Sequence, residues 1–575
     1  MSKKNNPELE KNLEEFQRRT GAPTKTFCLL PWVHLSTRPN GHMRVCCTAN
    51  ASSVGPTNDK EHGGEVGVLK NSDGKPANLN HSDLMSSWNN DYMKNVRTQM
   101  LNNEMPPSCM KCYKEEDAGH MSKRYWETEY WSRRVDMKEI LEETAEDGAI
   151  PPKIRYLDLR LGSKCNLKCI MCSPHDSSMW VKDWIKLHPQ IENESLKETM
   201  QWGNKGQIDG ATYNWHKKND AFWDQLYEQI PHMKQLYFAG GEATIIEEHY
   251  TLLEAVVERG YAPGIELRYN SNGLEMPQRL FDLWKQFKRV RFHYSVDSIG
   301  IMNDYIRYPS EWEHTVKQFH LLDNTGPNVE VTVACAVQAL NIYYLPDFVK
   351  WKLEQNFKKI NLWPLGAGMI NYHFVYHPPH LNVKVLPNWF KEMTHKKYDI
   401  FIKWLEENWE LCTKGSLTPV TYEDWRQAAY GVKRLQGMLQ FSESGDWSRQ
   451  RMPEFIEYIN KMDGIRDTNF RDVFPEMAPL LDWTPDDGED WDGEFDDRLL
   501  KELEDNLEKK EKELKELKRH IDLVSGEVIP TMMQEMNIST LKLADGSSVE
   551  VKPVYGASIT AVSYTHLTLP TTPYV

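Results

Sequence analysis

The stretch CNLKCIMC, Cys165 to Cys172, holds three thiols at the spacing C-x3-C-x2-C. It follows KIRYLDLRL, residues 153–161, which we predict to be a strand. In parallel β/α architectures, reactive groups gather at the carboxyl ends of the strands. Thiolates are soft ligands that suit zinc or iron–sulfur clusters. A closed zinc site needs four protein ligands and this stretch supplies three, so the origin of the fourth ligand decides what the site is.

From Lys153 to about Leu365 the chain alternates strand-like and helix-like segments. The predicted strands are residues 153–161, 235–240, 265–270, 290–297, 329–337 and 359–365. Amphipathic segments separate them, and a Trp-rich segment, residues 173–234, predicts a helical insertion after the first strand. The alternation predicts parallel β/α units, and six units are too few for a complete eightfold barrel.

Polar or flexible loops follow the next three predicted strands. FAGGEA ends the second strand, YNSNG ends the third and YSVDS ends the fourth. Each loop alone is a weak signal, because Gly-Gly and Asn-Gly are common turns. Their succession, at the strand ends that also carry the thiols, predicts one composite site.

The three-cysteine spacing joined to Gly-Gly-Glu resembles the radical S-adenosylmethionine (radical SAM) superfamily over about residues 153–365. The resemblance implies an α/β fold with a partial (βα)6 TIM-like barrel. It implies that one [4Fe–4S] cluster is held by Cys165, Cys169 and Cys172, with the open iron chelated by S-adenosylmethionine. Met171 is a departure, because an aromatic residue is common there. The other reading is a zinc ion completed by His175 or another residue.

The resemblance also implies the cosubstrate contacts. The motif that receives the amino group of S-adenosylmethionine is matched by Gly240, Gly241 and Glu242. Polar positions near its ribose and carboxylate are matched by Ser271, Asn272, Ser295 and Asp297. Arg307, in YIRYP, is either a further carboxylate partner or part of a surface ion pair. The implied reaction is reductive cleavage of S-adenosylmethionine to a 5′-deoxyadenosyl radical, which abstracts hydrogen from a substrate. It needs a low-potential electron donor such as flavodoxin or ferredoxin.

Five further cysteines lie in residues 25–125. FCLLPWVHLSTRPNGHMRVCC predicts a hairpin that turns at Asn40-Gly41, with one cysteine before its first strand and two, Cys46 and Cys47, at the end of its second. Neighbouring side chains on a strand point to opposite faces, so these two do not serve one site equally. PPSCMKCYKEE adds a knuckle with two more thiols. A hairpin and a knuckle make a closed site, and the spacing alone leaves zinc and a cluster open.

The pattern Cys28-x12-Gly41-x4-Cys46 resembles the start of the SPASM/twitch auxiliary-cluster domain and selects Cys46 over Cys47. No cysteine follows Cys112 before Cys165, so the match is to the shorter twitch form. It implies one auxiliary [4Fe–4S] cluster held by Cys28, Cys46, Cys109 and Cys112. Twitch domains usually follow the barrel, whereas this hairpin and knuckle precede it.

The 575 residues are 40% apolar, include ten cysteines and carry a net charge of −15. The acidity argues against a general nucleic-acid-binding surface. No apolar run is long enough to span a membrane, and the N-terminal residues lack the apolar segment of a signal peptide. We therefore expect a cytoplasmic protein, in which cysteines are metal ligands or buried thiols rather than disulfides. Cys335 and Cys412 are expected to be buried structural thiols.

The expected organisation begins with an arm or short helix, a twitch-like domain, a partial barrel and a mainly helical region, at residues 1–24, 25–125, 150–370 and 371–480. The stretch DWTPDDGEDWDGEFDD, residues 482–497, is acidic and turn-rich and predicts a linker.

Residues 498–560 combine a heptad seam, Leu500 to Val524, with a hairpin that turns at Asp545-Gly546. The seam fits either a helix packed within the chain or self-association through residues 498–525. AVSYTHLTLPT, residues 561–571, resembles a translated sequencing adapter, so we expect residues 561–575 not to be part of the natural protein.

Two functions follow from these patterns. Radical SAM relatives with auxiliary clusters often modify peptides or proteins, so a peptide or protein is the leading substrate, and a small molecule such as a sugar or nucleoside stays open. The alternative is a non-catalytic, metal- or cluster-stabilised interaction or assembly protein, which the C-terminal seam and hairpin support. Gly-Gly-Glu and SVDS favour the enzyme, because a scaffold needs no cosubstrate pocket.

Overall fold

The computed structural model describes residues 7–49, 67–117, 121–200, 210–360, 370–413, 419–427, 432–484, 540–542 and 548–550. The chain divides into two compact units, Met1–Glu489 and Asp490–Val575. The predicted heptad seam and residues 561–575 lie outside the described residues. In the second unit, β9 (Thr540–Lys542) and β10 (Ser548–Glu550) pair antiparallel. Among the described helices, none combines the length and apolar character needed to cross a membrane.

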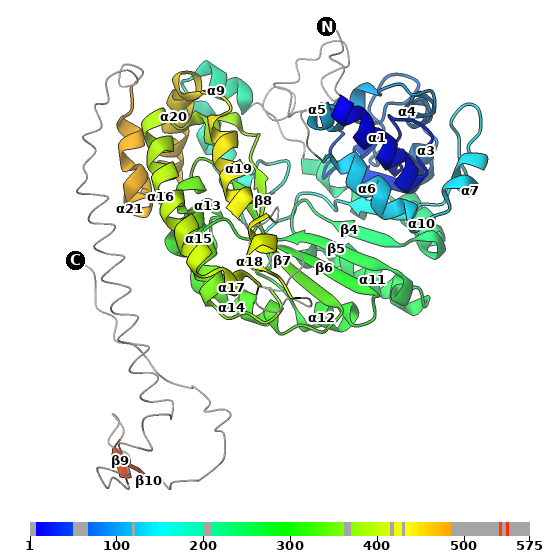
Figure 1. Ribbon diagram of the computed structural model, residues 1–575. Coiled ribbons are helices and arrows are strands. Elements are labelled where there is room, and N and C mark those ends of the chain that lie inside the picture. The colour runs from blue at the N-terminus through cyan, green and yellow to red at the C-terminus, as the bar shows by residue number, and fades with distance from the viewer. Residues whose placement is uncertain are drawn as a thin grey trace. The chain divides into compact units, whose positions relative to one another are not determined.

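A mixed α/β architecture with an eight-stranded sheet forms the first unit (Figure 1). The strand order is β2-β1-β3-β4-β5-β6-β7-β8, and only β1 and β2 pair antiparallel. The strands are β1 (His34–Thr37), β2 (Met43–Arg44), β3 (Tyr156–Leu159), β4 (Gln235–Phe238), β5 (Glu266–Ser271), β6 (Arg289–Ser295), β7 (Val329–Val337) and β8 (Asn371–Phe374). From β3 to β8 the strands are neighbours in chain order and parallel, as the alternating pattern predicts.

The last strand of this series is not the one that we predicted. We expected residues 359–365, but the strand that pairs with β7 begins at Asn371. The backbone N–H groups of Lys358, Lys359 and Ile360 donate to the carboxylate of Asp323 at 2.7–3.0 Å. Those groups are therefore not available to a neighbouring strand. Residues 361–365 lie outside the described residues.

One face of the sheet is apolar and covered by helices. It packs against α11 (Glu247–Glu258), α12 (Gln278–Trp284) and α14 (Trp312–Asp323). Tyr269 of β5 stacks on Phe238 of β4 and also contacts Trp284 of α12. Alternation along each strand sends the next side chain to the other face. That other face, here called the polar face, carries a row of side chains in register across β3 to β7: Asp158, Tyr237, Arg268, Arg291 and Glu330.

The N-terminal hairpin belongs to the same sheet. β1 pairs in parallel with β3, so that Ser36 lies opposite Asp158 and its hydroxyl donates to the Asp158 carboxylate at 3.0 Å. Between β1 and β2, the turn has Gly41 at φ +85°, where a Cβ would lie 2.8 Å from the side-chain oxygen of Asn78. The cysteine-rich N-terminal segment is therefore continuous with the parallel strands.

The remaining helices lie before, between and after the strands. Those of the N-terminal segment are α1 (Pro7–Thr20), α2 (Leu30–Val33), α3 (Leu84–Trp88), α4 (Asp91–Leu101), α5 (Met110–Asp117), α6 (Lys123–Ser132) and α7 (Met137–Glu142). Those within the strand series are α8 (Trp180–Leu187), α9 (Glu194–Thr199), α10 (Asp220–Gln229), α13 (Gly300–Ile306) and α15 (Leu345–Glu354). Those that follow β8 are α16 (Asn388–Glu407), α17 (Trp409–Thr413), α18 (Tyr422–Gln427), α19 (Val432–Glu443), α20 (Ser448–Arg466) and α21 (Phe470–Val473).

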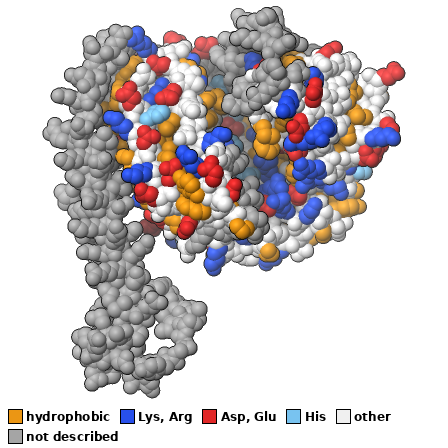
Figure 2. All heavy atoms as spheres, in the orientation of Figure 1, with side chains coloured by type: hydrophobic (Ala, Val, Ile, Leu, Met, Phe, Trp, Pro, Cys, Tyr) orange, Lys and Arg blue, Asp and Glu red, His pale blue; other side chains and the backbone are white. Residues whose placement is uncertain are grey.

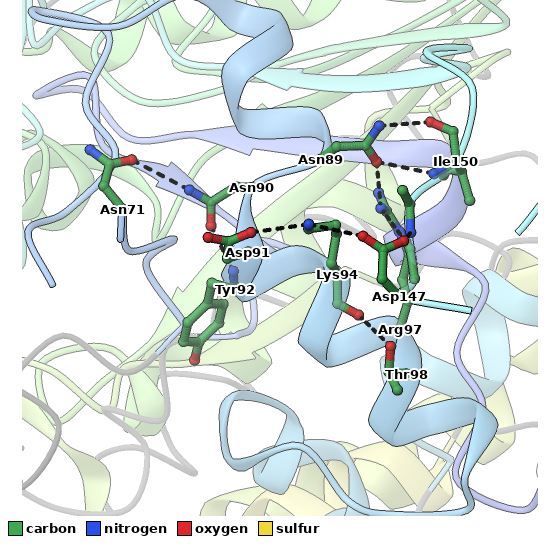
Figure 3. A network of polar contacts seen from close by, with 12 residues as sticks. Asn71, Asn89, Asn90, Asp91, Tyr92, Lys94, Arg97, Thr98, Asp147 and Ile150 are labelled. Atoms are coloured by element: carbon green, nitrogen blue, oxygen red, sulfur yellow. Dashed lines mark hydrogen bonds and ion pairs between the residues drawn. The ribbon is translucent and has the colours of Figure 1, made fainter. Parts of the chain in front are cut away.

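A buried guanidinium holds the N-terminal helices to the loop before β3 (Figure 3). Arg97 of α4 is fully buried and makes no ion pair with any described residue. Its donors reach the carbonyl oxygens of Pro31, Trp88 and Gly148 and the side-chain oxygen of Asn89 at 2.8–3.0 Å. Burial lowers its pKa to about 9. Segments that are far apart in the sequence thus depend on one cation for their hydrogen bonds.

We predict that Arg97→Met destabilises the first unit by about 3–5 kcal/mol, the usual cost of removing one partner from a buried charged network. Methionine keeps an apolar stem but removes the donors of three carbonyl oxygens, those of Pro31, Trp88 and Gly148. The measurement is the shift of the urea unfolding midpoint. The control is Lys94→Met on the same helix, whose exposed ammonium pairs with Asp91 and Asp147 and should matter little. Equal shifts in the two variants would contradict the role of Arg97.

Candidate functional site

The three-cysteine stretch forms the loop between β3 and α8. Its backbone is paired with the segment after α13: the N–H of Lys168 donates to the carbonyl of Tyr308, and the N–H of Ile170 donates to that of Ile306, both at 2.7 Å. Cys169 is buried, and Cys165 and Cys172 are half-buried. The N–H of Cys172 donates to the carbonyl of Cys169 at 2.9 Å. The loop therefore brings the thiols together and fixes them against residues 306–308.

Side chains from two helices hold the carbonyl oxygens of this loop. The indole N–H of Trp180 in α8 donates to the carbonyl of Cys169, and the hydroxyl of Tyr458 in α20 donates to that of Ile170, both at 2.7 Å. Arg466, also in α20, donates to the carbonyl of Lys168 at 2.6 Å. Its guanidinium also pairs with Asp183 of α8 at 2.9 Å. The helical region after β8 is thus part of the cysteine site, a role that no motif in the sequence signals.

Three donors approach the sulfur atoms. The N–H of Leu167 lies 3.4 Å from Cys165 Sγ, and the side-chain amide of Asn272 lies 3.8 Å from the same atom. The guanidinium of Arg307 lies 4.0 Å from Cys169 Sγ. Hydrogen-bond donors and positive charge directed at sulfur stabilise a thiolate. Hydrogen bonds to sulfur also tune the reduction potential of a bound cluster.

The loop after β4 adjoins the cysteine loop through its backbone. The N–H of Glu242 donates to the carbonyl of Lys164 at 2.8 Å, and the N–H of Gly241 donates to that of Asp176 at 3.1 Å. Gly240 and Gly241 have φ of +74° and +58°, a conformation that favours glycine. A Cβ on Gly241 would lie 2.5 Å from the Lys164 carbonyl. Among the described residues, none donates a hydrogen bond to the carbonyl oxygens of Gly240 and Gly241.

The carboxylate of Glu242 is occupied by the chain itself. It is 1% exposed. Its oxygens accept hydrogen bonds from the Ser271 hydroxyl and the Asn272 N–H at 2.8 Å, and from the Thr244 hydroxyl at 2.9 Å. Burial raises its pKa, and the bonds from the backbone N–H of Asn272 and the hydroxyl of Ser271 oppose this shift. The carboxylate therefore joins the loop after β4 to the end of β5.

The predicted residues after β6 divide into two kinds. Asp297 is fully buried, and its carboxylate accepts from the N–H of Ala336 in β7 at 2.7 Å and pairs with Arg307 at 2.8 Å. Arg307 is therefore a buried cation between Asp297 and Cys169, not part of a surface ion pair. Ser295 is half-buried at the end of β6, and its hydroxyl makes no hydrogen bond to the described residues.

Four of the N-terminal cysteines surround one small cavity of about 20 Å³. Its lining includes Cys28, Cys46, Cys109 and Cys112. Burial raises the pKa of each thiol, and Coulomb repulsion between neighbouring thiolates contributes at Cys28, Cys109 and Cys112. Lys111, Lys123 and Arg124 also line the cavity, and no carboxylate does.

Cys47 lies outside this cavity. Its sulfur accepts a hydrogen bond from the Lys123 ammonium at 3.1 Å. The structure thus separates the two neighbouring thiols: Cys46 lines the cavity and Cys47 does not. In the part of the chain that is described, no three His, Cys, Asp or Glu side chains converge tightly enough to hold a single metal ion. His175, the possible zinc ligand, contacts the hydroxyl of Tyr213 through Nδ1.

Comparisons with known proteins give three findings. A family model described as DUF7307, Pam3 gp33-like protein, matches residues 497–567. No curated protein matches the chain. Similar solved structures include Streptococcus suis SuiB bound to precursor peptide SuiA, with 12% identity over 49% of this chain and 58% of that chain, at a TM-score of 0.24.

Two further solved structures are similar to the same degree. SuiB bound to S-adenosylmethionine aligns with 12% identity over 55% of this chain and 62% of that chain, at a TM-score of 0.25. TYW1 with a lysine-pyruvate adduct bound aligns with 14% identity over 46% of this chain and 75% of that chain, at 0.24. The chain thus spans about three fifths of the SuiB structures that it matches. TM-scores of this size do not establish a shared fold.

We predict that Glu242→Gln weakens the connection between the loop after β4 and the end of β5. The amide of glutamine has one acceptor oxygen, and its NH2 group would face donors that now bind the carboxylate. A hydrogen bond to a charged group is worth about 1.5–3 kcal/mol. Hydrogen exchange of the Asn272 amide should accelerate, and the thermal midpoint should fall. Glu254→Gln, in an exposed ion pair with Arg279, is the matched control. Unchanged exchange at Asn272 would reject this role.

Proposed function

We propose that the chain is a radical SAM enzyme whose three-cysteine loop binds a [4Fe–4S] cluster and S-adenosylmethionine. One observation carries the proposal: the loops after β4 and β5 and the end of α13, the helix that follows β6, all contact the cysteine loop after β3. The N–H of Glu242 donates to the carbonyl of Lys164. The side-chain amide of Asn272 approaches the sulfur of Cys165, and the guanidinium of Arg307 approaches that of Cys169. Convergence of successive strand ends on three thiols is the arrangement that a partial (βα)6 barrel of this family requires.

The residues present fit such a cluster. Cys165, Cys169 and Cys172 supply three soft ligands on one short loop. The donors of Leu167, Asn272 and Arg307 compensate the negative charge that thiolates and sulfides bring. When bound, the cluster and its cosubstrate supply one-electron reduction and hydrogen-atom abstraction.

The chain's own groups would bind and orient the cosubstrate. The carbonyl oxygens of Gly240 and Gly241 are suited to accept from its ammonium group, because no described donor occupies them. Arg307 offers positive charge for its carboxylate, and the free hydroxyl of Ser295 is a ribose contact. Glu242, Ser271, Asn272 and Asp297 then act by holding these groups in place, through the bonds described above. This refines the direct contacts that the resemblance implies.

The N-terminal cavity fits an auxiliary cluster. Its lining combines four thiols with Lys111, Lys123 and Arg124, whose carboxylate partners lie outside the cavity. The cysteines that would bind it are Cys28, Cys46, Cys109 and Cys112. A zinc ion held by the same four sulfurs is the competing occupant, and iron analysis distinguishes the two. A peptide or protein is the proposed substrate, and a flavodoxin or ferredoxin the proposed electron donor.

We predict about eight irons per chain after anaerobic reconstitution, four for each cluster. Changing Cys165, Cys169 and Cys172 together to Ala should leave about half of this iron. Release of 5′-deoxyadenosine from S-adenosylmethionine and dithionite should stop. Iron content is measured colorimetrically and the cleavage product by chromatography. Cleavage that survives the triple substitution would refute the proposed function.

Cys46 and Cys47 provide a matched pair for the auxiliary site. We predict that Cys46→Ala loses the iron of that site and destabilises the N-terminal segment, because metal binding there contributes to folding. Cys47→Ala should retain full iron, since its thiol lies outside the cavity. The comparison uses iron per chain and the paramagnetic resonance spectrum of the reduced protein. Loss of iron only in Cys47→Ala would reverse the assignment.

A further inference from the structure

The polar face of the sheet brings two cations together at its centre. Arg268 of β5 and Arg291 of β6 are direct neighbours in the register, so two guanidinium groups lie side by side. In the view of Figure 2, Lys and Arg side chains gather in the hollowed centre of the molecule. Two adjacent cations inside a fold are unfavourable unless an anion compensates them.

Arg268 makes no ion pair with any described residue. Its Nε donates to Nε2 of His293 at 3.3 Å, and its guanidinium lies 5.1 Å from the centre of the Tyr237 ring. Nδ1 of His293 in turn contacts the hydroxyl of Thr332 at 2.7 Å. These contacts orient the guanidinium and leave its two terminal amino groups without a hydrogen-bond partner among the described residues. A fixed guanidinium with both amino groups unengaged is preorganised for a two-pronged contact with an oxyanion.

The nearby carboxylates are paired with other cations. Glu127 lies 3.4 Å from Lys123, and Glu129 accepts from both Arg19 and Arg133 at 2.5 Å. Glu330 lies 3.7 Å from Arg291 but also pairs with Arg289. Arg291 makes no hydrogen bond to these acids, because its closest approaches, 3.7 and 3.8 Å, exceed hydrogen-bond distance. Glu127 interacts electrostatically with Arg268, but none of these acids lies within ion-pair distance of its guanidinium.

The two guanidinium groups are accessible from outside. They line a cavity of about 330 Å³ between α6 and the polar face, together with Trp126, Tyr130, Gln235, Arg133 and the carboxylates of Glu127 and Glu129. Trp126 is 58% exposed. An aromatic rim over a cationic floor suits an organic molecule that carries an anionic group.

We propose that this cavity, which we name the Arg268 cavity, binds an oxyanion of the substrate, a carboxylate or a phosphate. Arg268 makes the two-pronged contact, Arg291 adds charge, and Gln235 adds a polar contact. The inference rests on the proposed function in calling the occupant a substrate. The binding of the anion itself requires no cluster.

The test is isothermal titration of the full-length protein at low ionic strength with inorganic phosphate in one arm and succinate in the other. We expect at least one of the two anions to bind, and Arg268→Gln to weaken that binding by tenfold or more. The preferred anion identifies the phosphate or carboxylate source. Arg268→Lys, which keeps the charge but loses the fork, should give an intermediate loss. If circular dichroism shows that Arg268→Gln is poorly folded, Arg268→Lys takes its place in the test.

Arg279→Gln is the matched control, because Arg279 lies on the outer surface and pairs with Glu247 and Glu254. It should bind the anion as the unchanged protein does. Absence of binding by both anions, or equal affinity in the Arg268 and Arg279 variants, would overturn the proposal. The outcome is separate from that of the proposed function. Anion binding lost in Arg268→Gln supports the cavity even in a protein that releases no 5′-deoxyadenosine, and iron-dependent cleavage without anion binding rejects it.

Discussion

The buried carboxylate of Glu242 is the group on which the arrangement of the site depends. Its own N–H binds the cysteine loop, and its oxygens accept from Ser271 and Asn272 at the end of β5. A buried charge is stable only when several donors surround it, so the three loops must keep their positions together. The carboxylate accepts the hydrogen bonds from Ser271 and Asn272, so the carbonyl oxygens of Gly240 and Gly241 are left without a donor among the described residues.

A second layer of contacts fixes the cysteine loop from the outside. Trp180, Tyr458 and Arg466 bind three consecutive carbonyl oxygens, so side chains hold the loop on one side while its N–H groups pair with residues 306–308 on the other. Because these carbonyl oxygens already accept hydrogen bonds, they do not need water molecules as partners. The sulfur atoms are then the groups of the loop that are left to bind a ligand. Arg466 connects this support to Asp183, so helices from both ends of the strand series converge on one short segment.

Local sequence patterns predicted those strands and loops that are determined by their own residues. β7 occupies the residues that the alternation of VEVTVACAV indicates, and the loops after β4 and β5 lie beside the cysteine loop because parallel strands end at one edge. The contributions of Tyr458 and Arg466 could not be predicted, because they come from a helix almost 300 residues away and belong to no motif. The position of β8 was missed because the Asp323 carboxylate captures the backbone that was expected to form the strand. Arg268 was overlooked because its lack of an ion pair with any described residue is a property of the assembled sheet.

The pairing of β1 with β3 has a consequence for biosynthesis. The strand at His34 is made early, but its parallel partner at Tyr156 emerges from the ribosome more than a hundred residues later. Contacts of such sequence separation form slowly, since a long loop must close first. The four thiols of the N-terminal cavity are complete once Cys112 has been made, whereas the edge strand beside them still lacks its partner. A nascent chain therefore presents its auxiliary ligands before the sheet that shelters them exists, and delivery of metal during synthesis would precede closure of the fold.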